Sequence, residues 1–90
     1  MDKLQIMKQN AQHAIDTLTQ NGYVENVGAL HLKENHTVTC VADVILPKRD
    51  GHGFYTVNVP LVYFADSPYW HVAGQEKRTT VADYIRLCTK

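Results

Sequence analysis

The sequence lacks the features that mark several large classes of protein. Its nine Lys and Arg residues balance nine Asp and Glu residues, so the formal net charge is zero. This balance argues against a general nucleic-acid binder, which needs clustered cations to neutralise phosphates, and against an acidic nucleic-acid mimic. No apolar run approaches the roughly 20 residues of a membrane span, and the first residues lack the basic and apolar parts of a signal peptide. We therefore expect a cytoplasmic protein that does not enter a membrane.

Recognisable catalytic and metal-binding motifs are also missing. The five histidines include no pair with the four-residue spacing of a helical metal site. His31 and Cys40 are expected to be diagonal neighbours in a sheet, whereas structural zinc requires four ligands. The only two cysteines, Cys40 and Cys88, fall within a strand and a helix pattern, so we expect buried, unreactive thiols. We expect no metal, no cofactor and no catalysis, and keep an enzyme of an unrecognised kind as a third hypothesis.

Two long runs rich in β-branched and aromatic residues are present, Thr37–Leu46 and Tyr55–Phe64. Each run alternates with period two and is bounded by Gly, Pro, Asn or Asp, which is typical of a β-strand. Pairing Leu46 with Tyr55 places the apolar side chains of both runs on one face. A shift by one residue would oppose Asp43 to an apolar residue. The two runs therefore predict a long hairpin in the first register.

A weaker strand pattern precedes the hairpin over residues 23–32. The polar stretch 33–36 predicts a turn, and a two-residue loop at its centre would pair His31 with Val38. In that register His31 shares the predicted core face with Val38, whereas Leu32 points to the opposite face. The sequence thus predicts one continuous first strand.

A short fourth strand is predicted after the polar turn that follows Phe64. Pairing Phe64 with Tyr69 puts Trp70 beside Tyr63, on the same face as the apolar residues of the hairpin. Pro60 cannot donate a backbone hydrogen bond, but it falls opposite the point where the fourth strand ends. Its missing donor is therefore expected to cost little.

Amphipathic patterns flank the strands at both ends of the chain. Residues 2–20 contain no Gly or Pro, and their apolar residues recur at intervals of three and four, which predicts a helix that ends at Asn21-Gly22. Thr80 begins a capping box, and residues 81–88 give a second helix an apolar side. The order predicts one α+β domain over residues 1–90, a two-layer sandwich of helix, four-stranded antiparallel sheet and helix, with both helices on one face.

The predicted sheet face away from the helices carries apolar as well as polar residues. A solvated face would be mostly polar, and large apolar patches mark partner or self-association surfaces, although scattered apolar residues are normal on any surface. Our leading hypothesis is a small non-catalytic protein-binding module: an inhibitor, adaptor or regulatory subunit, of a size that fits a phage or mobile-element accessory protein. Its partner would be another protein or a second copy, as a homodimer through this face. The predicted partner-binding residues are Ile45, Val62, Phe64, Tyr69 and His71.

The order of elements also resembles a double-stranded-RNA-binding domain. The resemblance lies in Gly74-Gln-Glu-Lys-Arg78, a glycine followed by basic residues, ahead of Val81-Ala82 at the head of the last helix. That family recognises RNA by shape and phosphate contacts, so the resemblance implies nucleic-acid binding. The chain differs from the family in an additional strand, in only two basic residues at this place and in its zero net charge. Nucleic-acid binding is therefore the alternative hypothesis, with candidate residues Lys48, Arg49, Lys77 and Arg78.

Overall fold

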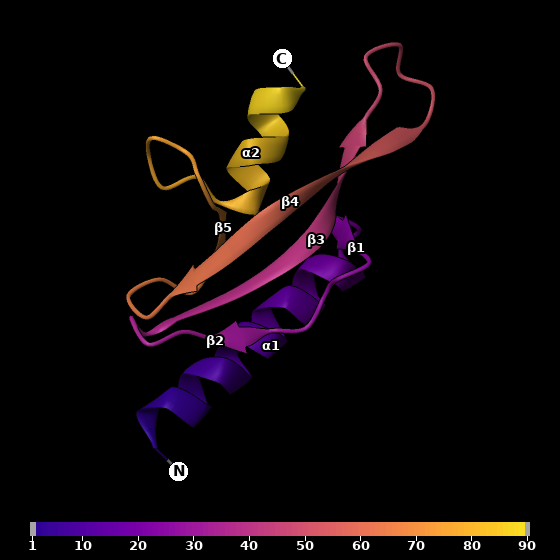
Figure 1. Ribbon diagram of the computed structural model, residues 1–90. Coiled ribbons are helices and arrows are strands. Elements are labelled where there is room, and N and C mark those ends of the chain that lie inside the picture. The colour runs from indigo at the N-terminus through magenta and orange to yellow at the C-terminus, as the bar shows by residue number, and fades with distance from the viewer. Residues whose placement is uncertain (1, 90) are drawn as a thin grey trace.

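The computed structural model describes residues 2–89 and shows an α+β fold, as predicted from the sequence (Figure 1). All strand pairs are antiparallel, and the sheet order is β1-β3-β4-β5, with β2 pairing with β3 as well. The elements in chain order are α1 (Lys3–Gln20), β1 (Val24–Glu25), β2 (His31–Leu32), β3 (Thr37–Pro47), β4 (Phe54–Phe64), β5 (Trp70–Val72) and α2 (Val81–Cys88).

The hairpin of β3 and β4 is the longest part of the sheet, with 11 residues in each strand. Leu46 lies opposite Tyr55 and Val44 opposite Val57, so the predicted register is confirmed. The alternation of β3 is equally regular, because five of its residues on one face are at most 4% exposed. Those five residues are Val38, Cys40, Ala42, Val44 and Leu46.

The pairing predicted for β5 is also confirmed. Trp70 lies opposite Tyr63, and Val72 lies opposite Leu61. The Ala73 N–H donates to the Pro60 carbonyl at 3.0 Å, so the backbone of Pro60 faces β5 and not β3. The missing N–H of Pro60 therefore falls outside the long ladder between β3 and β4.

The segment 23–32 differs from the prediction, because it forms two short strands in different registers. His31 pairs with Thr39 and Leu32 pairs with Val38, so the predicted pairing of His31 with Val38 is wrong by one residue. The cause is the turn, in which His36 adopts a left-handed conformation with φ of 60° and adds a third residue to the loop. His31 consequently lies on the face away from the core, and Leu32 lies on the core side.

A bulge separates β1 from β2. Asn26 has a φ of 51°, and the Gly28 N–H donates to the Val41 carbonyl at 2.8 Å. A Cβ at Gly28 would lie 3.2 Å from that oxygen, so glycine permits this close approach. β1 therefore pairs with β3 two residues out of step with β2, and Val24, which pairs with Val44, is 1% exposed on the core face.

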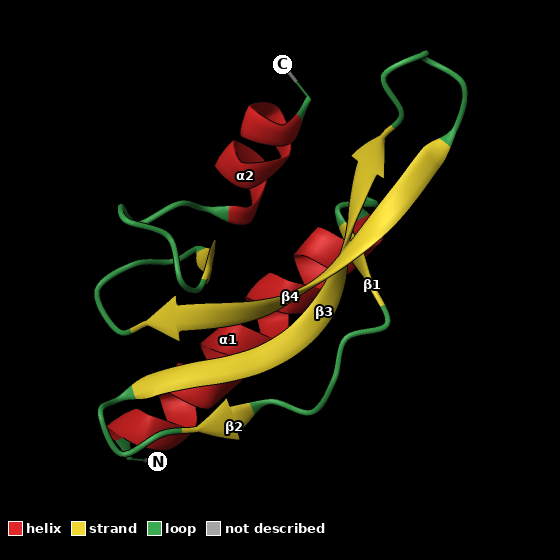
Figure 2. Cartoon of the chain, turned by 45° about the horizontal axis from the view of Figure 1, so that its top comes forward, coloured by secondary structure: helices red, strands yellow, loops and turns green. Residues whose placement is uncertain are grey.

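Both helices contribute to one core with the buried face of the sheet. Figure 2 shows α1 passing behind β3 and β4. Ala11 of α1 is fully buried, and the Trp70 Nε1 donates to its carbonyl at 2.9 Å. The Trp70 ring also lies 5.5 Å from the Tyr63 ring, centroid to centroid. Trp70 thus joins α1 to the sheet, and Val81 of α2 completes the same core.

Neither described helix combines the length and the apolar character that crossing a bilayer requires.

Candidate functional site

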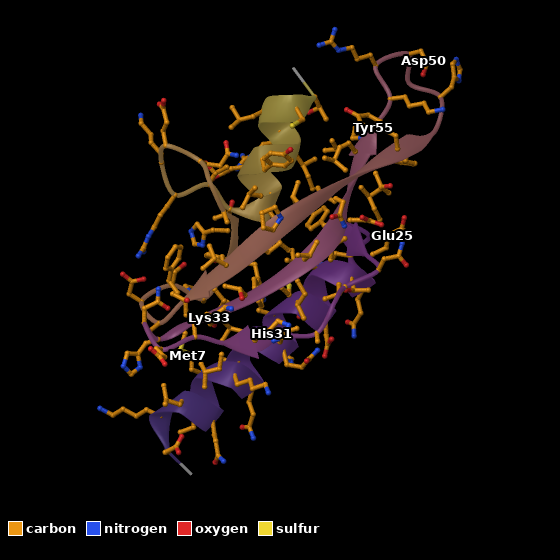
Figure 3. The ribbon with its side chains drawn as sticks, viewed as in Figure 1. Met7, Glu25, His31, Lys33, Asp50 and Tyr55 are labelled. Carbon is orange, nitrogen blue, oxygen red and sulfur yellow. The ribbon has the colours of Figure 1, made fainter. Side chains whose placement is uncertain are left out.

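The sheet face opposite the core, which we call the open face, is formed by alternate residues of β3, β4 and β5. Among the described residues that β3, β4 and β5 contribute to the open face, Asp43 is the only Asp, Glu, Lys or Arg, and Glu25 of β1 pairs with Asp43 on the same side of the sheet. Figure 3 shows side chains extending from both sides of the sheet. The open face comprises Thr37, Thr39, Val41, Asp43, Ile45, Pro47, Phe54, Thr56, Asn58, Pro60, Val62, Phe64 and His71.

Three neighbouring residues, Val41, Pro60 and Val62, form what we call the apolar centre of the open face. Val41 lies directly opposite Pro60, and Val62 is two residues further along β4, opposite Thr39. Val41 is 46% exposed, although it stands between Cys40 and a fully buried alanine on the same strand. The apolar centre therefore presents hydrocarbon to solvent from the middle of a rigid strand pair.

A carboxylate with fixed hydrogen bonds lies next to the apolar centre. Asp43 Oδ2 accepts from Asn26 Nδ2 at 3.0 Å, and Asp43 Oδ1 accepts from Asn58 Nδ2 at 2.9 Å. These two hydrogen bonds, with that from Asn26 the stronger influence, lower the pKa of Asp43 below its usual value. The left-handed backbone of Asn26, where β1 ends, accompanies this contact. The side chain is thus held ionised and oriented on the open face.

The loop after β5 folds back along that strand. The Val72 N–H donates to the Thr79 carbonyl at 2.8 Å, and His71 forms a β-bridge with Thr80. His71 is only 6% exposed, and its Nδ1 has no hydrogen-bond partner among the residues that the structure describes. The loop therefore closes the β5 end of the open face.

Arg78 of this loop covers Phe64. The guanidinium carbon lies 3.9 Å from the centre of the Phe64 ring, a cation–π contact, and the His71 ring meets Phe64 edge-on at 5.2 Å. Arg78 Nη1 also lies 2.8 Å from Asp66 Oδ1. The hydrogen bond from Arg78 is the main cause that lowers the pKa of Asp66. Phe64 and His71 are therefore less exposed than side chains on an uncovered sheet face would be.

The open face is hollowed at this end into a groove of about 960 Å³. The groove runs between the turn 33–36 and the loop 73–78, and Val62, Phe64 and His71 line its floor side. Three of the five predicted partner-binding residues therefore lie together. Ile45 lies on the same face but on the far side of Asp43 along β3.

Tyr69 lies elsewhere, in a second groove of about 650 Å³ between the two helices. The lining of this groove is mostly apolar and includes Tyr63, Trp70, Ala14 and Val81, and Tyr69 itself is 64% exposed. This groove is not among the sites predicted from the sequence. Its one sequence indication is the pair of aromatic residues directly after Pro68, facing the small residues in the apolar stripe of α1.

The four basic residues of the nucleic-acid hypothesis do not gather on one surface. Lys48 and Arg49 lie in the loop between β3 and β4, where Figure 3 labels Asp50, and Lys77 and Arg78 lie in the loop before α2. Figure 1 shows these two loops at different sides of the molecule. Arg78 is moreover engaged with Asp66 and Phe64.

The surroundings of the cysteines do not favour a nucleophilic thiolate. Burial raises the pKa of Cys40 to about 11, which disfavours the thiolate. Cys88 is half-buried on α2, and both thiols are free. His31 lies on the opposite face of the sheet from Cys40, so the prediction that the two are diagonal neighbours on one face is wrong. Within residues 2–89, no three side chains of His, Cys, Asp or Glu are placed to hold one metal ion.

Comparisons of the chain with models of protein families, with curated proteins and with solved structures found no match.

Proposed function

We propose that the chain is a small non-catalytic protein-binding module that docks a protein partner on its open face. The observation that carries the proposal is the apolar centre, in which Val41 is 46% exposed on a strand whose other face is buried. Burying such a group against a partner removes apolar surface from water, and exposed apolar groups that lie together mark interaction surfaces. An inhibitor, an adaptor and a regulatory subunit would each use a surface of this kind.

Asp43 indicates which chemical groups the partner would present. Its carboxylate is adjacent to the apolar centre and is oriented by Asn26 and Asn58. Each carboxylate oxygen has a second lone pair that can accept from a partner. The partner would therefore present an apolar group to Val41 and a Lys or Arg side chain to Asp43. A face-to-face homodimer is the other arrangement that the open face allows.

The free thiols support action in the cytoplasm. Cys40 and Cys88 are both unpaired. Free cysteines are typical of compartments in which glutathione and thioredoxin keep thiols reduced. We include a cytoplasmic location in the proposal on this ground.

Site-specific photo-crosslinking in extracts of the source cells tests the proposal. A photoreactive residue at Thr39, beside the apolar centre, should yield a distinct crosslinked protein, and one at Gln9 on the outer side of α1 is the control. Excess unlabelled wild type should suppress the product, whereas excess Val41→Asp should not, because that carboxylate would be buried unpaired in the contact. Equal products at both positions, or equal competition by both proteins, would refute the proposal.

Nucleic-acid binding through Lys48, Arg49, Lys77 and Arg78 is the alternative, and it predicts a different result. Micromolar binding of RNA or DNA that weakens steeply as salt rises would favour it, because released counterions carry such binding. The separation of the two basic pairs and the engagement of Arg78 favour the protein partner instead.

A further inference from the structure

The outer edge of β4 is unpaired along its first half. β3 pairs with the whole of β4, but β5 pairs only with residues 61–63. The Pro60 carbonyl bonds to Ala73, which shows that Pro60 faces the β5 edge. Because successive residues of a strand direct their backbone groups to opposite edges, Phe54, Thr56 and Asn58 face that edge too. On that edge, no described residue forms a backbone hydrogen bond with any of these three.

This free edge carries none of the usual protection against pairing with another strand. Natural edge strands are blunted by charged side chains, prolines, bulges or covering elements. β4 contains no Asp, Glu, Lys or Arg over its 11 residues, and its proline lies beyond the free part of the edge, opposite Ala73 where β5 ends. Figures 1 and 2 both show the end of β3 between α2 and the first half of β4, so α2 does not cover the edge.

We infer that a second copy of this chain pairs with this edge, so that two β4 strands join antiparallel about a two-fold axis at Thr56. The edge is complementary to itself in that register. Phe54 would pair with Asn58 of the other copy, and Thr56 with its own counterpart, and each pair exchanges two backbone hydrogen bonds. The free outward-facing positions run from Phe54 to Asn58, between the loop and Pro60, whose carbonyl already bonds to Ala73, so the two copies match end to end.

The side chains of the edge agree with this pairing. Facing threonines and facing aromatic and β-branched residues are favourable cross-strand pairs. Thr56 meets Thr56 on the open face, and Tyr55, which is 44% exposed, meets Val57 on the other face. The absence of charge means that two identical edges do not repel. The result is one sheet that continues through both copies and leaves both apolar centres free for the proposed partner.

Thr56→Pro is the decisive variant. Thr56 has the same parity along β4 as Pro60, whose carbonyl points away from β3 to Ala73, so the Thr56 N–H also points away from β3 and a proline there removes only the donor that a second copy would use. The wild type should show a monomer–dimer equilibrium in sedimentation at micromolar concentrations, and Thr56→Pro should remain monomeric with an unchanged circular dichroism spectrum. Val41→Lys, on the open face but off the edge, should still dimerise. A monomeric wild type, or a dimer lost in Val41→Lys and kept in Thr56→Pro, would overturn the inference.

Amide hydrogen exchange gives a second measurement that does not depend on a variant. In the dimer the N–H groups of Phe54, Thr56 and Asn58 become protected as concentration rises, whereas those of Tyr55 and Val57 are protected throughout by β3. Exchange at the first three positions should slow by at least tenfold between dilute and concentrated samples. If exchange does not depend on concentration, a second copy does not pair with this edge, and the inference is refuted.

Discussion

Both faces of β3 carry valine, but the valines of the two faces differ in exposure. Val38 and Val44 are fully buried, whereas Val41, between them on the same strand, is 46% exposed. Residue type does not account for the difference, since all three are valine. The helices cover one face only, so a valine is core or surface according to its parity along the strand. The stability of the protein should therefore reside in one face and its interactions in the other.

Trp70→Ala should produce the largest loss of stability and so tests the core face most strongly. The indole is 1% exposed, contacts Tyr63 and donates to the Ala11 carbonyl. We expect a loss of about 3–5 kcal/mol in the free energy of unfolding, the range for a large buried aromatic side chain. Denaturant melts measure it. The neighbouring change Tyr69→Ala is the control, because that ring is 64% exposed, and an equal loss from both variants would contradict the assignment of Trp70 to the core.

Thiol labelling compares two adjacent positions on opposite faces. In a Cys88→Ser background, Cys40 reports the core face, and in a variant that also carries Cys40→Ala and Val41→Cys, position 41 reports the open face. In the native state Cys40 should react at least about 100-fold more slowly than the cysteine at position 41, because Cys40 is buried and its thiolate is disfavoured. The two thiols should react alike in denaturant. Comparable native rates would show that the faces do not differ in access.

A single chemical change made on both faces gives a smaller and more exact comparison. Val44→Thr puts a hydroxyl into the core without a partner and should cost about 1–3 kcal/mol. Val41→Thr makes the same change on the open face and should alter stability by less than about 0.5 kcal/mol. Thermal or denaturant unfolding of both variants decides the matter. Equal losses would mean that the open face is covered in solution.

The sequence predicted this division of faces because alternation is a local property. Once Leu46 was paired with Tyr55, the facing of every residue of β3 and β4 followed from period two, and the structure has that register. Trp70 could be assigned to the core by extending the same pattern to β5.

The errors arose where the backbone leaves the regular strand. Neither His36 nor Asn26 is glycine, yet both adopt positive φ, and each shifts the register of the strand beside it. Composition alone does not reveal such a conformation, because any polar turn residue is a candidate. The cover of Phe64 by Arg78 was also missed, since it depends on how the loop before α2 folds back over the sheet. These local conformations determine that Phe64 and His71 are less accessible than the apolar centre.

Asp43 provides the smallest effect and the finest test of the open face. Because the amides of Asn26 and Asn58 lower its pKa, its contribution to stability is present above the pKa of an unfolded Asp, about 3.9. It is lost as the pH falls from there through the lower, folded pKa. Asn26→Gly removes one amide and tolerates the backbone φ of 51°, and Asn58→Ala removes the other.

Titration of the Asp43 carboxyl by nuclear magnetic resonance should show its pKa rising in both variants, more in Asn26→Gly, and most in the double variant. The pKa of Asp66, which Arg78 lowers, should stay where it is and serves as the internal control. If the Asp43 titration is unchanged in both single variants, the carboxylate is not held by the amides and does not offer a fixed acceptor to a partner. If the pKa shifts as expected, the two amides hold the Asp43 carboxylate ionised in the middle of the strand, which its position on the open face permits. One residue earlier, at the fully buried Ala42, the same carboxylate would lie in the core without these two donors.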